Sequence, residues 1–190
     1  VITGYGIVSC IGNNKEEVLE SLQNGRSGIT FSDEHRDLGF RSHVFGKPTL
    51  DPEEYLEKKA RRFMGNGAAW NYIAMQQAID DSGLEQSDIV NEKTGLIMGS
   101  GGPSTKALIE AADITRNKGP KRVGPFAVPK AMSSTNSATL ATPFGIKGIN
   151  YSISSACATS SHCIGNAYEM IQYGKPVSYT HLTLPTTYEV

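Results

Sequence analysis

Apolar and polar positions along the chain follow two periods, one typical of strands and one typical of helices. The apolar runs that predict buried strands lie at 1–3, 94–100 and 149–153. The segments with helical spacing or helix-end signals lie at 15–24, 51–64, 68–82, 104–116 and 157–173. Strands that alternate with helices predict an α/β fold, a mainly parallel sheet with helices on both faces.

Signals at the helix ends support these assignments. Asn14 is an N-cap candidate, and Gly25 follows the first helix, whose apolar side carries Val18, Leu19 and Leu22. Pro52 stands at the first position of the helix expected at 51–64. In the long helix over 68–82, which Gly83 ends, the side chains expected inside are Trp70, Ile73, Ala74, Ala78 and Ile79.

Composition narrows the class of protein. The 190 residues are 38% apolar and carry a formal charge of -1, which suits one globular unit without a general attraction to nucleic acid or acidic membranes. No run approaches the ~18–20 apolar residues of a membrane helix. Three cysteines do not suggest a disulfide scaffold. We expect a cytoplasmic protein that binds neither membrane nor nucleic acid.

Both ends of the chain look incomplete. Val1 is not a methionine and already lies in an expected strand, which indicates a clipped or partial start. Residues 176–190 are rich in threonine and lack glycine. Their alternation could form a short strand, but we expect this tail to be foreign to a domain that covers 1–175.

The segment 150–167 carries the candidate chemistry. A strand leads into a turn of small residues and then into a helix whose first turn holds Cys157. A helix N-terminus stabilises negative charge by ~0.3–1 kcal/mol, up to ~2 kcal/mol where partly buried, and so favours a thiolate. Small neighbours leave room for an acyl chain, and amides of the turn, including that of Cys157, could bind an oxyanion. This pattern predicts acyl transfer through a thioester; the alternative is that Cys157 is a buried packing residue.

The remaining cysteines and histidines give no catalytic partner for Cys157. Cys163 lies about 120° around the helix from Cys157, and His162 about 140°, so His162 is expected to be structural and not a base. Cys163 and Cys10 are expected to pack in the interior. The other histidines lie in a polar loop or in the tail; they are His35, His43 and His181.

Two weaker signals concern ligands. The spacing Gly4-x-Gly6-x-x-Ser9 resembles a dinucleotide fingerprint, but serine replaces the third glycine and no acidic residue follows near 24–30, so the glycines are expected to make a packing turn. We expect no cofactor and no metal.

Two basic clusters could be plain solvated surface or a docking site; they are Lys58, Lys59 and Arg62, and Lys121 and Arg122.

The run Ser-Ser-Ala-Cys-Ala-Thr-Ser at 154–160, with His162, Ile164 and Gly165, closely resembles the active-site motif of β-ketoacyl-[acyl carrier protein] synthases, nearest to the type I class of bacterial fatty-acid synthesis. The resemblance covers 1–175. Its further matches lie at 1–9, 25–29, 99–102, 123–126 and 130–132.

This resemblance implies a thiolase-like fold of two similar halves in α-β-α-β-α layers, of which the chain supplies the first. It implies that Cys157 takes an acyl group from acyl carrier protein, with its amide as one oxyanion donor. In the family, two histidines and a lysine of the second half support decarboxylation of the malonyl-carrier protein, whose carbanion then attacks the thioester. We therefore expect no turnover from this chain alone.

The resemblance also implies roles for the other candidates. It places the two basic clusters where the carrier protein docks, and Gly102 and Met132 near the acyl pocket, Met132 across the interface of a homodimer. Ordinary packing is the alternative for Gly102 and Met132. Two other functions remain open: a thiolase acting on coenzyme A thioesters, and a non-catalytic subunit that sets chain length, against which the retained Cys157 argues.

Overall fold

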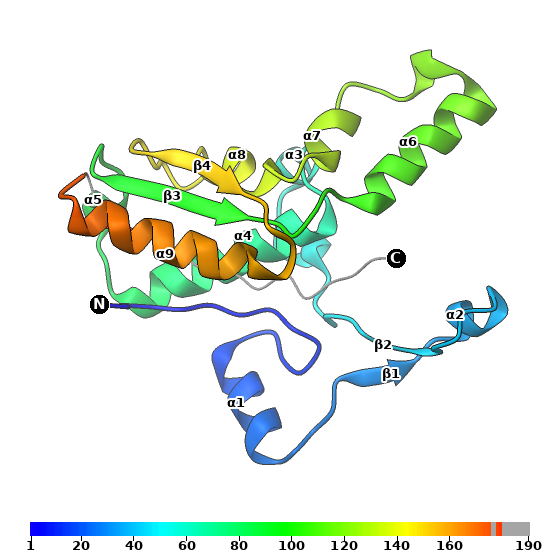
Figure 1. The fold of residues 1–190 in the computed structure, drawn as a ribbon, viewed down its shortest axis with the longest axis horizontal. Helices are drawn as coiled ribbons and strands as arrows, with labels where there is room; N and C mark the ends of the chain where they lie inside the picture. The colour runs from blue at the N-terminus through cyan, green and yellow to red at the C-terminus, as the bar shows by residue number, and fades with distance from the viewer. Residues whose placement is uncertain (176–177, 180–190) are drawn as a thin grey trace.

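The centre of the molecule is a small parallel sheet. The structure, a computed structural model, describes residues 1–175 and 178–179. Its parallel strands are β3 (Thr94–Gly99), β4 (Asn150–Ile153) and β5 (Ser178–Tyr179). They lie in the order β4-β3-β5. β3 pairs with β4, its neighbour in Figure 1, from Leu96 opposite Asn150 to Gly99 opposite Ile153. The strands predicted at 94–100 and 149–153 are confirmed, and their carboxyl ends lie side by side.

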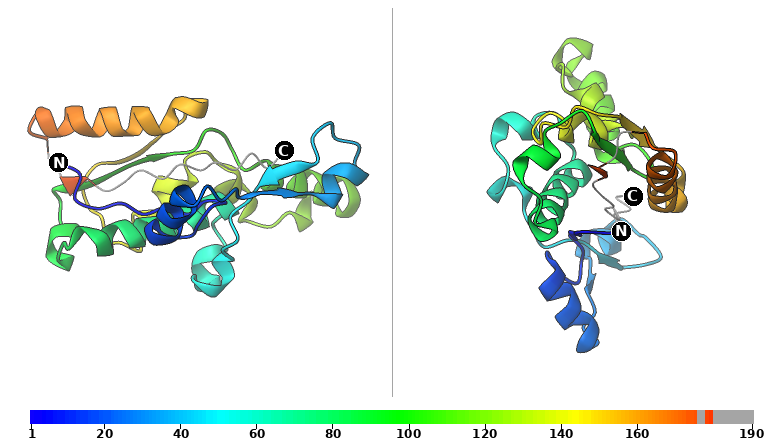
Figure 2. Two further views of the ribbon diagram at one scale, coloured as in Figure 1. Left: turned by 90° about the horizontal axis from the view of Figure 1, so that it is seen from below. Right: turned by 90° about the vertical axis from the view of Figure 1, so that its left-hand side faces the viewer.

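Helices cover both faces of this sheet. The helices α4 (Asn66–Ser82) and α8 (Thr135–Leu140) lie on one face, and α9 (Thr159–Gln172) lies on the other (Figure 2). Leu96 and Met98 of β3 join the cluster on the α4 side, whereas Ile97 packs against α9. This alternation follows from the period of two in a strand. The predicted α/β class, with a mainly parallel sheet between helices, is confirmed.

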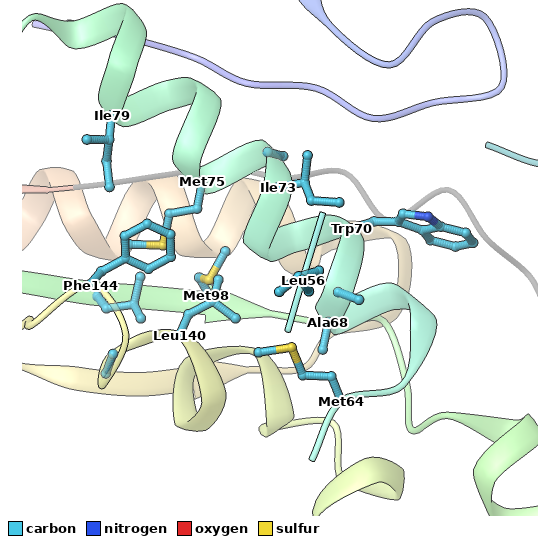
Figure 3. Close-up of a cluster of buried hydrophobic side chains, with 14 of the residues drawn as sticks. Leu56, Met64, Ala68, Trp70, Ile73, Met75, Ile79, Met98, Leu140 and Phe144 are labelled. Carbon is cyan, nitrogen blue, oxygen red and sulfur yellow. The ribbon is translucent and has the colours of Figure 1, made fainter. Parts of the chain in front are cut away.

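The main core lies between α4 and the sheet (Figure 3). Met75, Leu96 and Leu140 are fully buried, each stabilising the fold by ~1.5–3 kcal/mol through removal of apolar surface from water. Trp70 donates its indole N–H to the Leu50 carbonyl at 3.1 Å, so its polar atom is satisfied. The side chains predicted to be buried in α4 are all buried: Trp70, Ile73, Ala74, Ala78 and Ile79.

Two extensions project from this core (Figure 1). The first contains α1 (Lys15–Gln23), the antiparallel strands β1 (Ile29–Phe31) and β2 (Val44–Gly46), and α2 (Asp33–Asp37) between them. The second contains α6 (Thr105–Lys118) and the 3-10 turn η2 (Pro120–Arg122), after which the chain returns through α7 (Ala127–Ala131). The short helix α5 (Gln86–Ile89) precedes β3. No helix in the described part of the chain is long and apolar enough to span a bilayer.

The strand predicted at 1–3 is wrong. Val1 and Ile2 are exposed, and residues 1–8 run as extended coil beside α4. A strand needs neighbouring backbone as a partner, but here α4 side chains accept the amides instead: Tyr5 N–H donates to Asp81 at 3.2 Å and Ile7 N–H to Gln77 at 3.0 Å. The glycines at 4 and 6 do pack tightly, since a Cβ on either would overlap the backbone of α4.

The helix predicted at 51–64 is in fact two short pieces. A 3-10 turn, η1 (Pro52–Glu54), begins at the N-cap Asp51, and α3 (Lys58–Arg61) follows. Extended backbone at Glu57 (ψ 140°) separates them, beside Leu56, which is buried in the core.

Helix α1 begins and ends as predicted, but its apolar side is not covered. Asn14 caps it by accepting from the Glu17 amide at 2.9 Å, and Gly25 beyond its end has a φ of +61°. Leu19 and Leu22 are exposed, because α1 belongs to the first extension and not to the core. The segment 176–190, predicted to be foreign, lies outside the described residues apart from β5.

Candidate functional site

Cys157 lies in a strained turn between β4 and α9. The 3-10 turn η3 (Ala156–Ala158) follows the carboxyl end of β4, and α9 begins at Thr159, so Cys157 stands just before the helix and not inside its first turn. Ala156 has a φ of +44°, the one positive φ outside glycine in the part of the chain that the structure describes. A left-handed alanine costs about 1–3 kcal/mol unless its surroundings hold it.

The side chain of Thr159 holds this turn. Its Oγ1 accepts from the Ser155 N–H at 2.8 Å and donates to the Ala156 carbonyl at 2.8 Å. The Ala158 N–H donates to the Ser155 carbonyl at 2.9 Å. Thr159 is 4% exposed, so these bonds form next to the interior and are shielded from competing water. The amides of Ser155 and Ala158, on either side of Cys157, are therefore already engaged.

The end of β3 and the loop after it form the floor of the turn. A Cβ at Gly99 would overlap the Ile153 carbonyl oxygen and come within 2.5 Å of the Thr159 methyl, so only glycine fits. A Cβ at Gly101 would lie 3.2 Å from the Ala156 oxygen. Thr159 and Gly99 belong to the motifs at 154–160 and 99–102, but the sequence alone did not predict a role for either residue. The signal in the sequence that could have indicated this pair is a hydroxyl residue at the start of a helix together with a glycine at the end of a strand.

The three cysteines, all within the described residues, form no disulfide and occupy different environments. Cys157 is exposed, which contradicts the alternative of a buried packing residue. Cys163 is 3% exposed beside Ile97 and Ala167, as predicted. Burial raises the pKa of the Cys163 thiol, and a hydrogen bond with the backbone of Ile153 partly opposes this. Cys10 is half-buried against the backbone of the first extension, in agreement with a packing role.

The histidines occupy other places. His162 is exposed on α9, and its carbonyl accepts from the Asn166 side chain at 2.9 Å. His35 contacts the rings of Phe40 and Phe45, with centroids 5.0 and 5.3 Å away. These contacts belong to the first extension.

The segment of the first basic cluster contacts the chain just after the second cluster. The Phe126 ring, four residues after Arg122, meets the Phe63 ring edge-on at 5.0 Å, and the Arg62 guanidinium lies 5.6 Å from the Phe126 centroid. A cation over an aromatic face is attracted to it, so Arg62 is held against Phe126, in the segment that follows the second cluster. The five predicted basic residues are all exposed: Lys58, Lys59, Arg62, Lys121 and Arg122. Arg61 is instead paired with Glu53 at 2.6 Å.

Gly102 and Met132 occupy neighbouring segments. The Ser104 N–H donates to the Ala131 carbonyl at 3.1 Å and so joins the loop after Gly102 to the end of α7, where Met132 is the C-cap. A Cβ on Gly102 would meet nothing within 4 Å, and Met132 is 40% exposed. The acyl-pocket role of both residues stays a prediction.

Comparison with known proteins shows the family to which this chain belongs. Residues 1–176 match the family model described as the N-terminal domain of β-ketoacyl synthases. The chain is 56% identical to 3-oxoacyl-[acyl-carrier-protein] synthase 1 of Escherichia coli K12 over 177 residues and 52% identical to the synthase of the same name from Haemophilus influenzae over 176 residues.

These matches cover 92% of this chain but 44% and 43% of the two relatives, so the chain spans less than half of their length. A crystal structure of a β-ketoacyl synthase from Burkholderia phymatum superimposes with a TM-score of 0.82 at 24% identity, over 94% of this chain and 45% of that one. That likeness confirms the thiolase-like fold predicted from the sequence. The chain belongs to the β-ketoacyl synthase family, and residues 1–176 are its N-terminal domain.

Proposed function

We propose that the whole protein to which this chain belongs is a condensing enzyme of fatty-acid synthesis, with Cys157 as its nucleophile. The observation that supports this is the exposed thiol of Cys157 in a strained turn between a parallel strand and α9. An accessible thiol at a helix start suits the formation of a covalent acyl intermediate. The relatives named above are 3-oxoacyl-[acyl-carrier-protein] synthases, in agreement with this chemistry.

The proposed reaction has two stages. In the first, the Cys157 thiolate attacks the carbonyl of an acyl-carrier thioester, and the carrier thiolate leaves. In the second, a malonyl-carrier thioester loses carbon dioxide, and its carbanion attacks the Cys157 thioester. The new carbon–carbon bond forms as the bond to sulfur breaks, which releases the β-ketoacyl-carrier product and restores the thiolate. The decarboxylating histidines and lysine of the family belong to its second half, so we propose that this chain alone does not turn over.

The proposed partner is acyl carrier protein, docked on the surface formed by Lys58, Lys59, Arg62, Lys121 and Arg122. The Phe63–Phe126 contact supports one continuous surface, because it joins the segments that carry the two clusters. We further propose that the protein is a homodimer in which Met132 meets the partner's acyl pocket near Gly102. Val128 and Met132 at α7 are both exposed apolar residues available for such an interface.

Mass spectrometry after incubation with acyl-[acyl carrier protein] tests the nucleophile. We expect one acyl adduct on Cys157 of the complete protein, no adduct after Cys157→Ala, and an unchanged adduct after the matched control Cys10→Ala. Label on Cys10 or Cys163 in place of Cys157 would refute the assignment. Equal labelling by the acyl-coenzyme A thioester without the carrier would favour a thiolase.

Charge reversal tests the docking surface. Lys59→Glu with Arg62→Glu should weaken carrier binding about tenfold or more at low salt and flatten its salt dependence, because a positive surface attracts an acidic partner over long range. The matched control is Lys93→Glu. Lys93 is an exposed lysine just before β3, at the end of the strand opposite to the Cys157 turn. Isothermal titration at two salt concentrations measures both effects; an affinity equal to that of the control would eliminate this surface.

A further inference from the structure

One hydroxyl group binds both sides of the turn that carries Cys157. Thr159 Oγ1 accepts from the Ser155 N–H and donates to the Ala156 carbonyl, each at 2.8 Å. The Ala156 carbonyl belongs to the same peptide unit as the Cys157 N–H. The side chain of Thr159 is therefore bonded directly to the peptide group that precedes the nucleophile.

Because the peptide unit is planar, the bond from Thr159 to the Ala156 carbonyl also restricts the direction of the Cys157 N–H. A peptide unit is planar, and no cis bond occurs in the described residues, so the Cys157 N–H points opposite to the Ala156 carbonyl. Rotation of this unit would change ψ of Ala156 and φ of Cys157 together. The left-handed φ of +44° at Ala156 is a conformation that alanine leaves unless it is held.

The methyl group of Thr159 fixes the position of its hydroxyl. It packs against the Gly99 backbone so closely that a Cβ there would come within 2.5 Å. Branched side chains have few χ1 choices, and in the one present here the methyl faces Gly99 while Oγ1 bonds to the turn. Thr159 is thus anchored on β3 while its hydroxyl, together with its own backbone N–H, holds the Ala156 carbonyl before Cys157.

We infer that Thr159 is a positioning residue, which sets the direction of the Cys157 amide for the acyl-transfer step. This inference rests on the proposed function, in which that amide binds the oxyanion of the tetrahedral intermediate. An oxyanion donor acts only when it is already aimed at the developing charge. In this role Thr159 acts through the Ala156–Cys157 peptide and not on the substrate.

Two substitutions and two reactions test the inference in the complete protein. Thr159→Val keeps the shape but removes the hydroxyl, and Thr159→Ser keeps the hydroxyl but removes the methyl. Acylation by acyl-[acyl carrier protein] forms an oxyanion, whereas alkylation of Cys157 by iodoacetamide displaces iodide and forms none. Site-resolved mass spectrometry follows both rates, and thermal unfolding reports whether each variant is folded.

We expect Thr159→Val to slow acylation by about 10- to 100-fold and to leave alkylation within about twofold; the slowing is smaller than the ~100- to 1,000-fold loss on removing one oxyanion donor, because the donor is misdirected and not removed. Thr159→Ser should retain acylation within about threefold of the unaltered protein. Equal slowing of both reactions by Thr159→Val, unchanged acylation, or a serine variant as slow as the valine variant would each overturn the inference. Failure of the proposed function would appear already in the unaltered protein, as Cys157 that is alkylated but not acylated.

Discussion

Cys157 and Cys163 lie six residues apart, the first before α9 and the second within it, and their surroundings are opposite. Cys157 stands in the turn before the helix, where the carboxyl end of β4 meets solvent. Cys163 faces the sheet, where Ile97 and Ala167 cover it and burial raises its thiol pKa. A cysteine side chain is exposed at 157 and buried at 163 because η3 precedes the part of α9 that packs against β3. The contrast shows that the strand-to-helix turn, and not the helix alone, distinguishes the proposed nucleophile.

The largest effect is expected at the floor beneath the Cys157 turn. Gly99→Ala should destabilise the fold by about 3 kcal/mol, because its Cβ overlaps the Ile153 carbonyl and crowds Thr159. Gly102→Ala is the matched control, since its Cβ meets nothing within 4 Å and should change stability by less than about 0.5 kcal/mol. Urea denaturation of both variants measures the difference. Similar losses for the two would mean that the turn is not supported from β3.

The second effect compares the two cysteines directly. Cys163→Ser should lower the free energy of unfolding by about 1–3 kcal/mol, because it places a hydroxyl among apolar side chains. Cys157→Ser should lie within about 0.5 kcal/mol of the unaltered protein, since its site is exposed. Denaturation midpoints at pH 7 suffice for this test. A larger loss at Cys157 than at Cys163 would reverse the assigned environments.

The smallest effect is a change of stability with pH. The folded chain keeps the Cys163 proton to higher pH than the unfolded chain does, because burial raises its thiol pKa. As the pH rises past about 8.5, the usual pKa of a thiol, unfolding releases a proton and the free energy of unfolding falls. Tyr151, whose pKa is raised mainly by burial, adds a loss of the same sign at higher pH.

The variant Cys163→Ala isolates this contribution. Denaturation at pH 7 and pH 9.5 should show a smaller loss of stability with rising pH in Cys163→Ala than in the unaltered protein. Cys157→Ala is the matched control and should leave the Cys163 contribution in place. An identical pH dependence of Cys163→Ala and the unaltered protein would contradict the raised pKa.

Much of the sheet and its helices could be predicted because local patterns coincide with burial. The apolar period of α4 and the left-handed Gly83 at its end lie within single segments, as does the buried run of β3. Residues 1–3 carry the same apolar pattern as a buried strand, but a strand also needs a neighbouring strand, and the segment that follows them instead donates the Tyr5 and Ile7 amides to α4 side chains. Side-chain acceptors on a distant helix leave no signal in the sequence of the segment whose amides they bind.

The candidate site also contains one part that a contiguous motif predicts and one part that depends on contacts between distant segments. Cys157 could be found because its motif of small residues is contiguous. The role proposed for Thr159 depends on a left-handed Ala156 and a close Gly99 from a distant strand, and alanine gives no sequence signal for positive φ. The contact of Arg62 with Phe126 joins segments more than sixty residues apart, so the link between the two basic clusters also needed the structure.

Reaction rates of the three cysteines test the central claim most directly. The folded protein is treated with iodoacetamide at pH 7.5, and site-resolved mass spectrometry follows each thiol over time. We expect Cys157 to be alkylated first, Cys10 to follow slowly, and Cys163 to react only when denaturant unfolds the chain. Labelling of Cys163 in the folded protein as fast as Cys157, or a Cys157 that reacts only after unfolding, would contradict it.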